Sequence, residues 1–96
     1  MTNYKRGVEI ERRCMEQLEK VGYTAMRTAG SHGTFDVIAF NKLGVRFIQL
    51  KRCKGTLKSF KNEKEEIYNT QLPLNATGEI WVWVDNKGWL VQEVVK

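Results

Sequence analysis

The first part of the chain has its apolar residues at helical spacing. Between residues 7 and 21, apolar side chains recur every three or four positions, which predicts an amphipathic helix with one buried stripe. The centre of that stripe is expected to consist of Ile10, Cys14, Leu18 and Val21, with Val8 and Met15 at its margins. Gly22 follows directly and is predicted to cap the helix.

The rest of the chain alternates between strand-like segments and turns. β-branched and aromatic residues predict strands over residues 23–28, 34–40, 45–52, 79–84 and 89–95. Tight turns are expected at residues 41–44 and 85–88, and a second, more polar helix over residues 60–72, before Pro73. The order helix-strand-strand-strand-helix-strand-strand predicts a single α/β domain over residues 1–96, with helices flanking a mixed central sheet.

Composition adds the kind of partner to this picture. The 96 residues are 42% hydrophobic, enough for one small core, and carry 16 Lys+Arg against 11 Asp+Glu, a formal charge of +5. A basic domain of this size makes nucleic acid the first partner to test. No segment has the roughly 20 apolar residues of a membrane span or the form of a signal peptide, so we expect a soluble, cytoplasmic protein.

The few metal-binding residue types limit the chemistry. Cys14, Cys53 and the single histidine, His32, are too few for a structural zinc site. Glu11, by contrast, falls inside the apolar stripe of the first helix. A carboxylate on a packed face is costly unless a cation or hydrogen bonds compensate, although at the edge of the stripe it would reach water instead.

Three further polar residues interrupt the apolar strands. With a tight turn at residues 41–44, antiparallel register predicts that Asp36 lies opposite Gln49 and Thr34 opposite Lys51. An acid, an amide oxygen and an ammonium group on one sheet face suit metal-assisted phosphodiester hydrolysis, because a divalent cation takes oxygen ligands and a nearby lysine offsets developing charge. The alternative is a structural Asp–Lys ion pair beside a hydrogen-bonded glutamine.

Basic and glycine-rich segments surround these residues. The turn at residues 27–33 contains two glycines. It also contains three side chains that can donate hydrogen bonds to a phosphate, those of Arg27, Ser31 and His32. Residues 37–62 contain no Asp or Glu, so their cations predict a phosphate-binding track, with a solvated loop as the alternative. Those cations are Lys42, Arg46, Lys51, Arg52, Lys54, Lys58 and Lys61.

The residues in this order resemble a known family. GVEIER at 7–12, GY at 22–23, Arg27, GSHGTFDVIA at 30–39 and FIQLK at 47–51 are similar to the archaeal-type Holliday junction resolvases, of the PD-(D/E)XK restriction-endonuclease-like superfamily. The resemblance covers about the first half of the chain. It implies a restriction-endonuclease-like core and a homodimer that cuts branched DNA with Mg²⁺ or Mn²⁺.

The resemblance also implies roles for single residues. Glu11, Asp36 and Gln49 match the metal-site positions, and Lys51 matches the catalytic lysine. The expected DNA-binding residues, from the resemblance and from the basic segments together, are Arg12, Arg27, Ser31, His32, Arg52, Lys54 and Lys58.

The sequence departs from the family pattern at two positions. Phe35 replaces the usual proline, and Gln49 replaces the acidic residue of the (D/E)XK element, which removes a charge from the metal site. A junction-binding module with weakened or lost catalysis is therefore one alternative, and a virus-type replication-repair nuclease of the same superfamily is another. A third is a protein-interaction module that uses the tryptophan-rich strand at residues 80–84.

Overall fold

A computed structural model describes residues 3–28 and 33–96 of the chain. The elements are α1 (Asn3–Lys20), β1 (Thr24–Arg27), β2 (Val37–Asn41), β3 (Gly44–Cys53), α2 (Lys61–Asn69), β4 (Ala76–Val84) and β5 (Gly88–Val94). The predicted order of helices and strands is confirmed, and most boundaries differ from the prediction by one to three residues.

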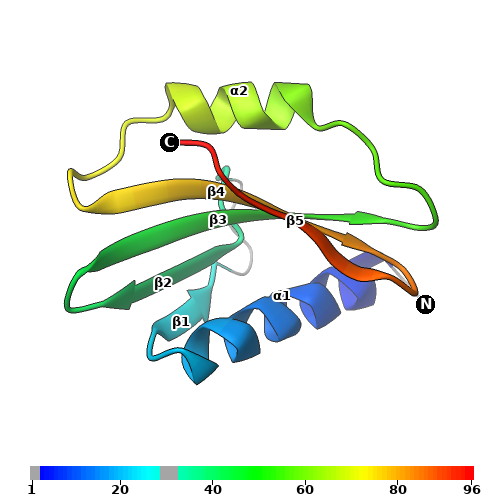
Figure 1. The fold of residues 1–96 in the computed structure, drawn as a ribbon, viewed down its shortest axis with the longest axis horizontal. Coiled ribbons are helices and arrows are strands. Elements are labelled where there is room, and N and C mark those ends of the chain that lie inside the picture. The colour runs from blue at the N-terminus through cyan, green and yellow to red at the C-terminus, as the bar shows by residue number, and fades with distance from the viewer. Residues whose placement is uncertain (1–2, 29–32) are drawn as a thin grey trace.

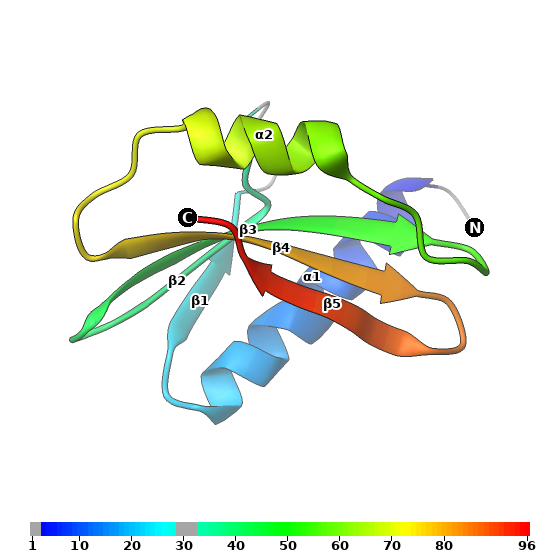
Figure 2. The same cartoon turned by 45° about the horizontal axis from the view of Figure 1, so that its top comes forward.

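The strands form one sheet with a helix on each face. The strand order is β1-β2-β3-β4-β5, with β3 and β4 parallel and the other neighbours antiparallel. α1 lies on one face and α2 on the other (Figures 1 and 2), so the predicted α/β class with a mixed sheet is confirmed. The parallel β3–β4 connection passes through α2, as such crossovers usually pass through a helix. Within the described part of the chain, no helix is long and apolar enough to cross a membrane.

Two hairpins set the strand register as the turn residues predict. The β2–β3 hairpin pairs Phe40 with Val45 and Asn41 with Gly44. The Asn41 side chain accepts the Leu43 N–H at 2.8 Å and the Gly44 N–H at 3.2 Å, so it replaces backbone acceptors inside the turn. The β4–β5 turn has positive φ at Asn86 and Gly88, the residue types that tolerate that conformation.

The core between α1 and the sheet contains most of the predicted stripe. Ile10, Cys14 and Leu18 are buried against Val37, Ala39, Ile48, Leu50 and Trp81. Val21 was expected in that stripe, but its side chain is 66% exposed. The prediction is wrong there because α1 ends at Lys20, so Val21 lies in the turn with Gly22, at φ 95°, and not on the buried face of the helix.

A second core lies between α2 and the other sheet face. Ile67 from α2 is fully buried with Ile80, Val82, Val84 and Cys53. α2 was predicted to continue to residue 72, but it ends at Asn69 because Thr70 is extended, and the Thr70 hydroxyl donates to the Glu66 carbonyl at 2.8 Å. Pro73 therefore does not end this helix.

The tryptophan-rich strand contributes to the packing. Trp81 is 1% exposed, and its ring centroid lies 5.4 Å from that of Trp89, which in turn lies 5.2 Å from Trp83. Edge-on aromatic pairs at this spacing stabilise a core. The aromatic residues predicted as a protein-interaction surface are thus largely used inside the fold.

Candidate active site

Asp36 lies just before β2, where that strand separates from β3. Its N–H donates to the Ile48 carbonyl at 2.8 Å, and its carboxylate accepts the Leu50 N–H at 2.8 Å. Extending the register from the Val37–Ile48 pair would place Phe35 opposite Leu50, but the Phe35 carbonyl accepts the Thr28 hydroxyl instead. The Asp36 side chain therefore takes over a backbone position in the ladder, which fixes its carboxylate beside residues 49–51.

This geometry differs in detail from the predicted strand. The strand was expected to begin at Thr34, with Thr34 facing Lys51, but β2 begins at Val37. The Thr34 hydroxyl donates to the Glu66 carboxylate of α2 at 2.5 Å. The ladder thus ends before the predicted Thr34–Lys51 pair, because the Leu50 N–H donates to the Asp36 side chain while the Asp36 carbonyl accepts the Thr28 N–H.

Gln49 is the one buried polar side chain of the described residues with an unpaired atom. Its side chain is 8% exposed, and Oε1 is buried and has no hydrogen-bond donor within the described chain. A buried carbonyl oxygen without a partner costs about 1–3 kcal/mol. Such an oxygen is suited to a cation or to a donor that arrives with a ligand.

Lys51, two residues along β3, faces α2. Its Nζ lies 3.8 Å from Oε2 of Glu63, and each side chain is about one-third exposed. The positive charge of Lys51 also acts on Asp36, where it opposes the effect of burial on the carboxyl group. Asp36 and Lys51 therefore lie close enough to interact, and Gln49 directly precedes Leu50, whose N–H binds the Asp36 carboxylate.

Glu11 contributes from α1. One carboxylate oxygen lies 3.6 Å from Nη1 of Arg27, which answers the question of how a carboxylate is accommodated on the packed face of the helix. Burial raises the pKa of Glu11, and the charge of Asp36 raises it further against the opposing effect of Arg27. Glu11 and Asp36 are thus close enough to repel each other.

The pKa of Asp36 is raised, like that of Glu11. Burial raises its pKa above the ordinary value of 3.8, although the Leu50 N–H and the Lys51 charge act in the opposite direction. Two neighbouring carboxylates whose pKa values are both raised are a common feature of functional sites, and a bound cation would favour their ionised forms.

The oxygen donors fit a hard divalent cation. Residues 3–28 and 33–96 contain no group of three His, Cys, Asp or Glu side chains arranged to hold a metal ion. Mg²⁺, however, is commonly held by one or two carboxylates together with water and substrate phosphate. Glu11 and Asp36 supply two such carboxylates close together, and Gln49 adds a buried oxygen without a donor among the described residues.

The predicted DNA-binding residues near α1 are already in ion pairs. Arg12 bonds Glu16 at 2.7 Å across one helical turn, and Arg27 pairs with Glu11. Ser31 and His32 lie outside the described residues.

Two arginines of the predicted phosphate-binding track form ion pairs within the protein. Arg46 is bonded to the buried Glu79 at 2.7 and 2.8 Å, and Arg52 is bonded to Asp85 at 2.7 Å and lies 3.7 Å from Glu9. Residues 37–62 contain no acid, so these acidic partners come from elements distant in sequence. Lys54 and Lys58 are exposed, and among the described residues no ion-pair partner is found for either.

Two carboxylates of α2 were missed by the sequence argument. Glu63 faces Lys51, and Glu66 faces Thr34. The three-residue spacing of Glu63 and Glu66 places them on one helix face, but only the packing of α2 shows which strand that face meets. Glu79 was also missed; it is 1% exposed and accepts bonds from Arg46, Thr77 and Trp81.

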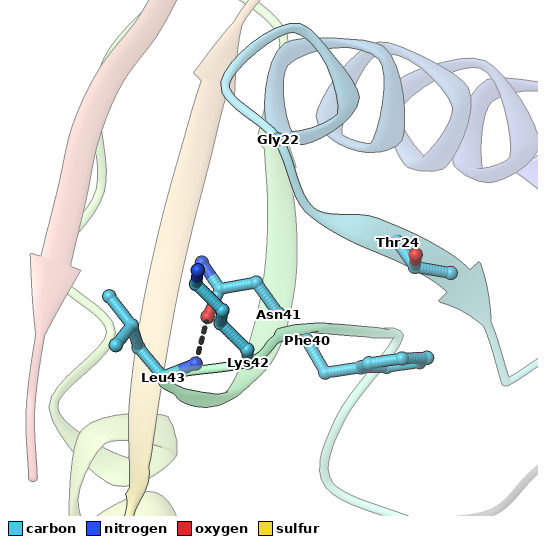
Figure 3. Close-up of a pocket in the computed structure, with 6 residues that line it drawn as sticks. All are labelled: Gly22, Thr24, Phe40, Asn41, Lys42 and Leu43. Atoms are coloured by element: carbon cyan, nitrogen blue, oxygen red, sulfur yellow. Dashed lines mark hydrogen bonds between the residues drawn. The ribbon is translucent and has the colours of Figure 1, made fainter.

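One hollow on the molecule lies away from these residues. It measures about 600 Å³ and lies between the α1–β1 turn and the β2–β3 hairpin, as Figure 3 shows. Its lining residues are Gly22, Thr24, Phe40, Asn41, Lys42 and Leu43. Apart from Lys42, which the sequence places in the basic track, none of them was predicted to act in the site, so the chemistry is assigned from the carboxylates and Lys51 rather than from cavity size.

Comparisons with known proteins point to one family. The family model of the archaeal Holliday junction resolvases (Hjc) matches residues 2–94. The solved structure of Hjc from Archaeoglobus fulgidus, a Holliday junction resolvase from an archaeal hyperthermophile, superposes with a TM-score of 0.73 at 24% identity, over 94% of this chain and 73% of that chain. The comparison with curated proteins gave no match.

Proposed function

Because the chain belongs to the archaeal Holliday junction resolvase family, we propose that it is a metal-dependent endonuclease that hydrolyses phosphodiester bonds in branched DNA. One observation carries the proposal beyond family membership. The Asp36 carboxylate accepts the Leu50 N–H at 2.8 Å, which holds an acid against the segment of β3 that carries Gln49 and Lys51.

The cofactor of the proposal is Mg²⁺ or Mn²⁺, held by Glu11, Asp36 and Gln49. When bound, such a cation favours ionisation of water and offsets charge on the phosphate under attack. The raised pKa values of Glu11 and Asp36 support this assignment, because a nearby cation relieves the cost of two buried carboxylates. The neutral Gln49 oxygen adds a ligand without adding charge, so we expect modest metal affinity.

The chain's own groups then position the substrate. Lys51 extends from β3 with its ammonium protons free of hydrogen bonds to described residues and is proposed to donate to a phosphate oxygen or orient the attacking water. Asp36 cannot rotate away without breaking its bond to Leu50. This fixed placement supplies orientation, which is a large part of catalysis in phosphoryl transfer.

DNA binding is proposed to use the basic residues around this site. Lys54 and Lys58 are exposed on the segment after β3 and are the best placed to reach phosphates. Arg12, Arg27, Ser31, His32 and Arg52 complete the proposed set. Symmetric cutting of a four-way junction needs two sites, so we expect a homodimer that acts inside the cell, where DNA is found.

A second function is favoured by one residue. Gln49 is neutral where the resolvase pattern has an acid, and this supports a junction-binding protein with weak or no catalysis. Both functions predict binding to branched DNA, and only the first predicts hydrolysis.

A cleavage panel separates the two functions. Four-way junctions, flaps and duplexes are incubated in Mg²⁺ or Mn²⁺ with the wild type, Gln49→Glu and Asp36→Ala. The nuclease predicts metal-dependent cutting of branched DNA by the wild type and none by Asp36→Ala. Binding without cutting by the wild type, with cutting by Gln49→Glu, would instead establish the weakened binder. Absence of branched-DNA binding would overturn both.

A further inference from the structure

Helix α2 presents two carboxylates to the segments that carry the proposed site. Glu63 Oε2 lies 3.8 Å from Nζ of Lys51, and Glu66 Oε1 accepts the Thr34 hydroxyl at 2.5 Å. The two glutamates are three residues apart and share a helix face. One contact reaches the β3 end of the site and the other the segment just before Asp36, so α2 is tied to both halves.

The Lys51–Glu63 contact is an ion pair without a hydrogen bond. At 3.8 Å the nitrogen–oxygen distance exceeds that of a direct N–H···O bond, and no other acceptor for Lys51 is found in the described part of the chain. Its ammonium protons therefore stay available to a phosphate or a water molecule. Each side chain is about one-third exposed, so the pair adds little stability, but it selects a direction for a flexible lysine.

The alternative direction for Lys51 is towards Asp36. Lys51 already acts on that carboxylate electrostatically, and Gln49 leaves no acid between them on β3. Without Glu63, the attraction of Lys51 to Asp36 would be unopposed by that ion pair, and an Asp36–Lys51 pair would occupy a proposed metal ligand. Glu63 thus supplies, from a different element, the negative charge that β3 lacks.

We propose that Glu63 is a positioning residue, which holds the Lys51 ammonium group towards the scissile phosphate and away from Asp36. The inference rests on the proposed function, because it assigns Lys51 a phosphate of branched DNA. Glu66 has a supporting part through its bond to Thr34.

The test is the binding of a four-way junction in Ca²⁺, measured by fluorescence anisotropy over a range of salt concentrations. Lys51→Met is introduced into the wild type, Glu63→Gln and Glu65→Gln. Glu65 is the matched control: it is exposed on the same helix, and its removal changes the net charge equally. Glu63→Asp keeps the charge with a shorter side chain, and melting temperatures verify folding.

The positioning role predicts a specific coupling. Lys51→Met should weaken binding roughly fivefold in the wild-type and Glu65→Gln backgrounds but less than twofold in Glu63→Gln, with Glu63→Asp intermediate. If the wild type cuts junctions, Glu63→Gln should also lower kcat and leave KM nearly unchanged. Equal effects of Lys51→Met in all backgrounds would overturn the role of Glu63 and leave the proposed function intact. Wild type that does not bind junctions would overturn both.

Discussion

Replacing Gln49 perturbs the position at which the chain departs from the resolvase pattern. Its side chain is 8% exposed, and Oε1 has no hydrogen-bond donor within the described residues. Gln49→Glu turns that oxygen into part of a carboxylate of the same shape. Gln49→Met keeps the length of the side chain and removes the oxygen. Together, the two variants distinguish the effect of charge from the effect of packing.

The magnitudes follow from the burial of this oxygen. In EDTA, Gln49→Met removes an unpaired buried acceptor, which costs about 1–3 kcal/mol, so we expect the variant to be at least as stable as the wild type. Gln49→Glu places a further carboxylate beside two whose pKa values are already raised, and we expect a loss of about 1–2 kcal/mol. For a domain of this size, 1 kcal/mol corresponds to roughly 4–8 °C in Tm.

Mn²⁺ should reverse the order of stability of the two Gln49 variants. A charged ligand in place of a neutral one is expected to raise Mn²⁺ affinity by roughly tenfold or more, because the affinity of hard cations depends on the number of charged ligands, and saturation at 100 times Kd stabilises the fold by about 2.7 kcal/mol. Isothermal titration calorimetry with Mn²⁺ and melting curves in EDTA and Mn²⁺ measure both quantities. Equal Mn²⁺ affinity in Gln49→Glu, Gln49→Met and the wild type would refute the assignment of Gln49 to the metal site.

Three further results are expected. In EDTA, Asp36→Asn should gain stability relative to the wild type as pH rises above about 4, because the raised pKa of Asp36 makes the folded wild type bind the proton more tightly than the unfolded chain; a pH-independent difference in Tm would contradict this. Glu79→Gln should cost about 3 kcal/mol in urea unfolding, because Arg46 loses its buried partner. The hydrogen bonds that lower the pKa of Glu79 against the effect of burial also predict that this difference shrinks as pH falls through that lowered pKa; a small cost at neutral pH would refute the buried pair. Leu18→Ala should cost about 3 kcal/mol and Val21→Ala less than about 0.5, since only Leu18 is buried; equal costs would place Val21 back in the core.

Local patterns were sufficient to predict much of the fold. The helical spacing of Ile10, Cys14 and Leu18 and the turn residues at both hairpins determine which faces are buried and how neighbouring strands pair. The exposure of Val21 was not predictable from spacing alone, because it depends on where Gly22 ends the helix. The early end of α2 at Asn69 likewise depends on Thr70 and not on the more conspicuous Pro73.

The candidate site was predictable only where local geometry, the register of the β2–β3 hairpin or the spacing of α1, determines which residues meet. Register brings Asp36 to the Gln49–Lys51 segment, and helical spacing places Glu11 on the packed face. The side-chain bond from Leu50 to Asp36 and the Lys51–Glu63 pair depend on how a strand separates and where a helix packs. Contacts over such sequence distances also explain why Arg46 and Arg52, apparently free in the sequence, are neutralised by Glu79 and Asp85.

The most direct test of the account is to map cleavage on a four-way junction with labelled strands in Mn²⁺, for the wild type and Asp36→Ala. We predict paired cuts at symmetric positions by the wild type, dependent on the metal, and no cuts by Asp36→Ala although it still binds the junction. Cutting that persists in Asp36→Ala, or a wild type that binds and leaves the junction intact, would contradict the claim that this carboxylate site hydrolyses branched DNA.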